Sequence, residues 1–300
     1  MRLVAAAALC LFLAGCDRGK TGLLRIDPAL ESLAPADSVF VVGANVEAIR
    51  DTPVYHRLVT GAVLPQLQEF IDKTGVDPRK DLSQLLSCSN GKTSLWMARG
   101  KFNVAAIESR LQANGPAPAS YKNHRFFGTE QTSMTFLNSS TFLAGSASEL
   151  RDIIDRGHSG RGLPAPLRDL LKTLPPGDQI YAALTGGLGG LNLAVPENSN
   201  LSTLLQVLRT VDTASLGMDL SKGLNLKLDV NCKTERDAKF VHDMIRGVVG
   251  LGRLNTPDNH PEFLKLYDAI HVTQQQARAD VTADIPQDLA DQFLDLWLKR

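Results

Sequence analysis

The sequence lacks an excess of charge of either sign, because its 32 lysines and arginines balance its 32 aspartates and glutamates. A nucleic-acid partner favours a basic face, so this balance argues against one. Aromatic residues are also sparse, at 6%, but the apolar fraction of 43% is that of a chain with a real core. The length of 300 residues suits two domains of ordinary size.

Patterns that bind metals or cofactors are missing. The histidines show neither the i,i+4 spacing nor the short-loop spacing that would place two of them on one metal ion. They lie at His56, His124, His158, His242, His260 and His271. We therefore predict no metal site and no cofactor.

Nucleotide and nucleophile motifs are also absent. Gly91-Lys92-Thr93 looks like the end of a phosphate-binding loop, but that loop needs a glycine five residues earlier, where Leu86 stands. No Gly-x-Ser-x-Gly elbow occurs, and Ser146 is better interpreted as the first residue of a helix. Asp77 and Asp81 flank Pro78-Arg79-Lys80 and are interpreted as self-paired loop charges. No catalytic residue is predicted.

The first 15 residues have the layout of a signal peptide. Arg2 precedes an apolar run from Leu3 to Gly15, which is shorter than the roughly 18 residues a membrane-spanning helix needs. Leu13-Ala14-Gly15-Cys16 resembles the lipobox of bacterial lipoproteins, which implies that Cys16 is acylated and becomes the new N-terminus. Acyl chains bury many methylenes at about 0.8 kcal/mol each, so we expect a lipid-anchored protein of the cell envelope.

Asp17 follows the modified cysteine and resembles the signal that retains lipoproteins on the inner membrane. Residues 16–32 are interpreted as a tether. About twenty residues separate Cys16 from the first strand candidate near Ser38, a reach of roughly 25 Å if they are flexible. We therefore expect the folded body to work at the periplasmic face of the inner membrane.

Two further cysteines remain in the mature chain. The envelope is an oxidising compartment, so a Cys88–Cys232 disulfide would join the two halves of the chain. Two buried free thiols are the alternative, because spacing alone does not show proximity.

The two halves of the chain share an order of predicted elements. Leu33-Ala34-Pro35-Ala36-Asp37-Ser38-Val39-Phe40 aligns with Leu174-Pro175-Pro176-Gly177-Asp178-Gln179-Ile180-Tyr181, and the two matched aspartates are expected to shape the turn before each strand. Asn90-Gly91 predicts a hairpin with a type I′ turn, and Lys222-Gly223 separates a second pair of strand-like runs. Helices are predicted over 104–113 and, capped by Thr234, over 235–249.

Further strands are predicted over 133–137, 141–144, 270–275 and 278–283, with helices over 148–155 and 287–298. Alternation such as Leu224-Asn225-Leu226-Lys227-Leu228 is typical of an antiparallel sheet with one apolar face. We predict an α+β fold of two tandem repeats, 33–156 and 167–300, each a mainly antiparallel sheet with helices on one face. A linker, 157–166, joins them, and whether they share one sheet is open.

This layout is similar to that of uncharacterised bacterial lipoproteins classed as domains of unknown function. The lipobox, the Pro35 to Phe40 strand start and the Thr74 to Leu82 loop carry the resemblance. Such families have no established catalytic residues, so the resemblance assigns none here.

The loop after the predicted strand 180–184 is the best sequence candidate for a contact surface. Gly186-Gly187-Leu188-Gly189-Gly190-Leu191 lacks the dinucleotide fingerprint, but it combines backbone freedom with apolar residues. We predict a non-catalytic binding or scaffold role toward an envelope protein or component. A carrier of a lipophilic ligand in an apolar cavity is the alternative, and a hydrolase whose site the fold assembles is the third.

Overall fold

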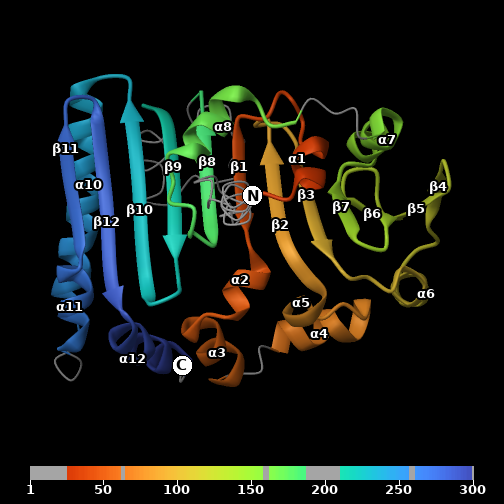
Figure 1. Cartoon of the computed structure of the whole chain (residues 1–300), viewed down its shortest axis with the longest axis horizontal. Helices are drawn as coiled ribbons and strands as arrows, with labels where there is room; N and C mark the ends of the chain where they lie inside the picture. Colours follow the sequence, from red (N-terminus) through yellow and green to blue (C-terminus); the bar gives the residue numbers. More distant parts are fainter. Residues whose placement is uncertain (1–25, 62–64, 158–161, 187–209, 257–260, 299–300) are drawn as a thin grey trace, which may run out of the picture.

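Twelve strands of the described residues form one antiparallel sheet. The computed structural model describes residues 26–61, 65–157, 162–186, 210–256 and 261–298. The strands are β1 Phe40–Ala44, β2 Leu82–Ser89, β3 Ser94–Gly100, β4 Ala119–Tyr121, β5 His124–Gly128, β6 Ser133–Asn138, β7 Thr141–Gly145, β8 Ile180–Thr185, β9 Val211–Asp219, β10 Gly223–Cys232, β11 Ile270–Gln275 and β12 Arg278–Pro286. Their order is β11-β12-β10-β9-β8-β1-β2-β3-β7-β6-β5-β4 (Figure 1). The question that the sequence left open is thus answered, because the two halves share one sheet.

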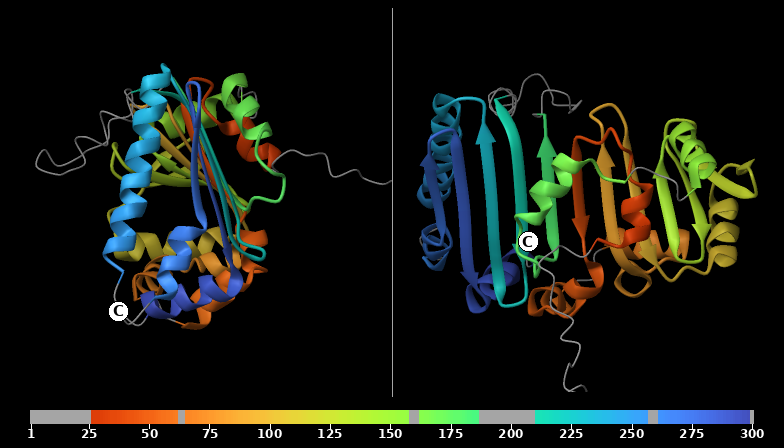
Figure 2. Two further views of the ribbon diagram at one scale, coloured as in Figure 1. Left: turned by 90° about the vertical axis from the view of Figure 1, so that its left-hand side faces the viewer. Right: turned by 45° about the horizontal axis from the view of Figure 1, so that its top comes forward.

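Helices lie on both faces of this sheet rather than on one. One face packs against α1 Pro28–Leu33, α7 Ala147–Arg156 and α8 Ala165–Lys172, and the other against α6 Val104–Asn114 and α10 Glu235–Leu254 (Figure 2). The remaining helices are α2 Val46–Arg50, α3 Pro53–Gly61, α4 Pro65–Thr74, α5 Pro78–Asp81, α11 Glu262–Asp268 and α12 Gln287–Leu298. The α+β class is confirmed. The one-face arrangement is corrected, because the central strands carry apolar side chains on both faces.

Neighbouring residues of one strand show this division. Val41 and Leu86 belong to the cluster beneath α1, α7 and α8, whereas Phe40 and Leu85 belong to clusters on the opposite face. Successive side chains of a strand point to opposite faces of the sheet. A strand with apolar residues at consecutive positions is therefore packed against other elements on both faces.

The first predicted hairpin forms, but its turn differs from the predicted type. A type I′ turn needs positive φ at both central residues, and here only Gly91 has one, at 88°. The Asn90 side-chain oxygen instead accepts hydrogen bonds from the Lys92 and Thr93 amides, at 3.0 Å each. This side-chain cap shapes a four-residue connection between β2 and β3.

The turns before β1 and β8 have matching geometry, one residue away from the sequence alignment. The Ser38 amide donates to the Pro35 carbonyl, and the Asp178 amide donates to the Pro175 carbonyl, both at 3.2 Å. Ser38 therefore corresponds to Asp178, and Asp37 corresponds to Gly177. The expectation that the two aspartates occupy equivalent turn positions is wrong, because the sequence alignment is offset by one residue from the alignment of the two turns.

The two halves meet where β1 pairs with β8. Five residue pairs join these strands, from Phe40 opposite Leu184 to Ala44 opposite Ile180. Gly43 lies opposite Tyr181, whose buried ring occupies the space that a Cβ on Gly43 would fill, 2.3 Å from the ring. Helices α1 and α8, one from each half, then bury leucines in a single cluster over this joint.

The disulfide is not formed. Cys88 and Cys232 are both free and buried, and they belong to separate clusters on opposite faces of the sheet. Their positions match the alternative of two buried thiols.

Replacing Gly43 with alanine should weaken the joint. The added methyl group would overlap the Tyr181 ring, and overpacking of this kind typically costs 1–3 kcal/mol, so we expect a loss of about that size in the free energy of unfolding. Urea denaturation measures it. Gly177→Ala is the matched control, because a Cβ there meets nothing within 4 Å. Equal stability of both variants would contradict the packing described.

Asp178 should make stability depend on pH. Its side chain is buried and its Oδ2 has no hydrogen-bond partner among the described residues. Burial, followed by the charge of Asp219, raises the pKa of Asp178 from its usual 3.8 to about 6. Because the folded state disfavours the ionised form, the group's stabilising effect is full below about pH 4 and is lost as pH rises through about 6.

Asp178→Asn removes this ionisation. We expect the variant to be more stable than the parent by roughly 1 to 3 kcal/mol at pH 8 and by little at pH 4. Urea denaturation at both pH values tests this, and a stability difference that does not change with pH would contradict it.

Candidate functional site

An apolar cavity of about 320 Å³ lies between α10 and strands β8, β9 and β10. Its lining residues are all apolar except Ser215. They are Phe40, Ala182, Ala183, Leu184, Val211, Ala214, Ser215, Leu216, Leu228, Val230, Val241, Met244 and Ile245. A cavity of this kind has the surface chemistry of a site for a hydrocarbon ligand.

Small residues in the sheet make room for the cavity. Leu184, Ala214 and Val230 lie side by side across β8, β9 and β10, and Ala182 lies beside Leu216 in the same way. Directly opposed residues share one face of a sheet, so alanines in two of these rows leave space beneath the helix. Met244 and Ile245 of α10 close the space from above.

The apolar surface continues from the cavity onto the exposed side of α10. Phe240, Met244, Val248 and Leu251 lie on one side of this helix, because their spacing follows its 3.6-residue turn. Met244 lines the cavity, while Phe240, Val248 and Leu251 are 48%, 64% and 61% exposed. Exposed apolar surface beside an apolar cavity is a feature of ligand and partner sites.

Helix α10 begins where the sequence predicts and runs five residues further. The Thr234 hydroxyl accepts a hydrogen bond from the Asp237 amide at 3.1 Å, which confirms the predicted cap. Ala238 and Val241 are buried against the sheet, so the first turns anchor the helix above the cavity.

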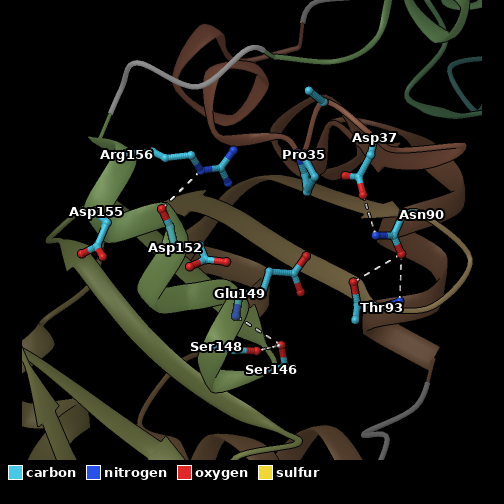
Figure 3. Close-up of a pocket in the computed structure, with 11 residues that line it drawn as sticks. Pro35, Asp37, Asn90, Thr93, Ser146, Ser148, Glu149, Asp152, Asp155 and Arg156 are labelled. Carbon is cyan, nitrogen blue, oxygen red and sulfur yellow. Dashed lines mark hydrogen bonds between the residues drawn. The ribbon is translucent and has the colours of Figure 1, made fainter.

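A second, polar groove of about 680 Å³ lies where α7 begins, beside the β2–β3 turn (Figure 3). It is lined by Pro35, Ala36, Asp37, Asn90, Thr93, Ser146, Ser148, Glu149, Asp152, Asp155 and Arg156. The groove brings together the titratable groups at which a hydrolase site would be sought.

Most of the charged groups in this groove are held by neighbours. Asp37 accepts a hydrogen bond from Asn90 at 2.8 Å, and Asp155 binds Lys122 at 2.7 Å, which together with Tyr121 lowers its pKa. Figure 3 shows Glu149 and Thr93 pointing toward one another, whereas Asp155 points away. Burial, and then the charge of Asp37, raise the pKa of Glu149.

The groove does not assemble a nucleophile with its base. Ser146 caps α7, accepting from the Glu149 amide at 3.3 Å, so the predicted helix-start role is confirmed. The described lining contains neither histidine nor cysteine to activate a serine. In the described part of the chain, no group of three His, Cys, Asp or Glu residues could hold a metal ion.

The other predicted residues divide into two groups. Asp77 caps α5 and pairs with Arg79 at 2.8 Å, and its own amide donates to Asp81 at 2.7 Å, so these charges are self-paired as predicted. Cys16, Asp17 and residues 187–191 of the glycine-rich loop lie outside the described residues. Gly186 is described, with a φ of 75° at the end of β8.

The sequence offered an apolar cavity only as an alternative and did not show where it lies. The cavity depends on alanines from β8 and β9 lying together, which neither strand shows alone. Residues 235–254 do carry a sequence signal for it. Their apolar residues cover more of the helix surface than the single stripe that packs a helix onto a sheet, which predicts a second apolar contact.

No family model matches the chain, and no curated protein matches it. Solved structures of TP0453 are similar in outline. Crystal form I has a TM-score of 0.47 at 10% identity, over 91% of this chain and 98% of that one. Forms III and IV both have TM-scores of 0.49, at 10% and 9% identity, over 92% and 91% of this chain and 99% and 97% of theirs. Similarity of this degree says nothing about what the chain binds.

Proposed function

We propose that this chain is a lipid-anchored protein of the bacterial envelope whose folded body binds a lipophilic ligand without catalysis. The observation that carries the proposal is the almost wholly apolar cavity beneath α10. Its volume of about 320 Å³ is at the small end of ligand cavities, which suits a single hydrocarbon chain rather than a bulky cofactor.

The hydrophobic effect favours an occupant of this pocket. The pocket opens to solvent, so its apolar lining contacts water when no ligand is bound. Removing apolar surface from water is favourable by about 25 cal/mol per Å². A chain lying in the cavity, with its end along Phe240 and Leu251, would cover the lining and part of the exposed side of α10.

The proposed anchor agrees with such a ligand. Acylation of Cys16 would hold the body close to a membrane, which is the source of hydrocarbon chains in the envelope. A lipophilic-ligand carrier is the alternative to the predicted envelope-protein partner, and the cavity, rather than the glycine-rich loop, is its proposed site.

We also infer that the halves arose by duplication. From the β1–β8 joint, the strand order is β1-β2-β3-β7-β6 in one direction and β8-β9-β10-β12-β11 in the other. Each half also begins with a helix and the same turn before its first strand.

Native mass spectrometry of the mature chain, purified with Cys16 replaced by serine, should detect a bound apolar molecule. Dodecanoate added to delipidated protein should bind, and Ala214→Phe should weaken its binding at least about tenfold by filling the cavity. Calorimetric titration measures the affinities.

Ala144→Phe is the control, since Ala144 is a half-buried strand residue outside the cavity. It should bind dodecanoate as the parent does. Absence of co-purified ligand together with absence of dodecanoate binding would overturn the proposal.

The anchor has its own test. Cys16→Ser should abolish labelling by radioactive palmitate and leave the precursor uncleaved, because the cysteine that is acylated before cleavage is gone. Labelling that persists in this variant would contradict lipidation at Cys16.

A further inference from the structure

Strand β11 is one edge of the sheet. It pairs only with β12, from Ile270 opposite Ala283 to Gln275 opposite Arg278, and no strand of the described residues lies on its other side. Just before β11, the Asp284 amide donates to the Ala269 carbonyl at 3.3 Å. Hydrogen-bonded pairs alternate in an antiparallel ladder, so residues 271, 273 and 275 bond toward β12. The amides and carbonyls of Ile270, Val272 and Gln274 therefore point away from the sheet.

The sequence of this edge leaves it open to pairing. Proteins protect edge strands with proline, with lysine or other charges, or with bulges. Ile270-His271-Val272-Thr273-Gln274-Gln275 contains no proline, lysine or carboxylate, and its register with β12 is regular. Such a strand can accept another strand along its outer side.

A groove of about 520 Å³ runs between this edge and α10. Val249, Ile270 and Val272 give it apolar walls, and Arg246 and Arg253 give it positive charge. Arg253 is paired with Asp268, whereas Arg246 has no ion pair in the part of the chain that the structure describes. The groove thus combines open backbone groups, apolar walls and an uncompensated cation.

We propose that this groove binds an extended peptide segment of a protein partner, which adds a strand to β11 and places a carboxylate at Arg246. The outward backbone groups of β11 would supply the ladder, and the apolar walls would take alternate side chains. Arginine is the residue best suited to hold a carboxylate through paired hydrogen bonds.

A second copy of the chain fits this edge less well. Two β11 strands paired antiparallel would be related by a twofold axis perpendicular to the sheet, which puts both α10 helices on the same face. Each helix would then turn Arg246, which has no ion pair among the described residues, toward that of the other copy. Like charges brought together in this way oppose association, so an acidic segment is the better occupant.

This site is separate from the cavity. Arg246, Val249 and Arg253 face β11 from one side of α10, whereas Met244, Val248 and Leu251 are on the side toward β8 and β9. The two sites can therefore be tested independently, and failure of one leaves the other standing.

A random twelve-residue peptide library displayed on phage, selected on the mature chain with Cys16 replaced by serine, supplies the probe. We expect enriched peptides with alternating apolar residues and an acidic residue. The strongest binder, synthesised, should bind Arg246→Glu at least about tenfold more weakly. It should also lose affinity for Val272→Pro, which removes an outward amide but no bond to β12.

Two controls match these variants. Arg236→Glu makes the same charge change at an exposed position of α10 outside the groove, and Val272→Thr keeps the amide with a side chain of similar shape. Both should bind the peptide within about twofold of the parent. Thermal melting checks that each variant folds. If Val272→Pro is unstable, the test uses Arg246→Glu and a peptide whose acidic residue is changed to the corresponding amide, and each change should weaken binding.

Three results would overturn the proposal. One is a selection that enriches no peptide, and another is a binder that tolerates both Arg246→Glu and Val272→Pro. The third is a parent chain that sediments as a dimer which Val272→Pro converts to a monomer, because the edge would then serve a second copy.

Discussion

The pairing of β1 with β8 is the contact on which the rest of the structure depends. It joins two half-sheets edge to edge, so β1 and β8 are interior strands of one sheet rather than exposed edge strands. The two strands pack closely because Gly43 leaves room for the ring of Tyr181. Leucines from α1 and α8 then cover this pair of strands in one cluster. The halves therefore form one body, and both faces of the central strands must be covered.

That constraint explains where the sites lie. One face beside the β1–β8 pair is filled by α1, α7 and α8. On the other face α10 lies over β10, β11 and β12 and reaches toward β8 and β9 through side chains such as Val241 and Met244. With alanines beneath it, a single helix leaves the apolar cavity. On its other side α10 reaches the outermost strand, β11, and turns arginines toward its open backbone. One helix thus borders an apolar site and a basic one.

Much of the fold could be predicted from the sequence, because periodicity is a local property. The predicted strand 270–275 and helix 287–298 match β11 and α12, and helix 104–113 falls one residue short of α6. The turn type at Asn90 was not predictable because it depends on hydrogen bonds of the Asn90 side chain. The absence of a Cys88–Cys232 disulfide depends on which face of the sheet each cysteine points to. The cavity was hidden because Ala182 and Ala214 come from different strands, and their alignment is fixed only by the ladder between β8 and β9.

We propose that a hydrocarbon chain lies between α10 and the sheet. Nuclear Overhauser measurements between ¹³C-labelled dodecanoate and the methyl groups of the folded protein test it most directly. The structure predicts contacts to the methyls of Met244, Ile245, Leu184 and Leu228, from the helix and the sheet together. Contacts confined to the exposed Leu254, or contacts to methyls in the cluster beneath α1 and α8, would contradict it.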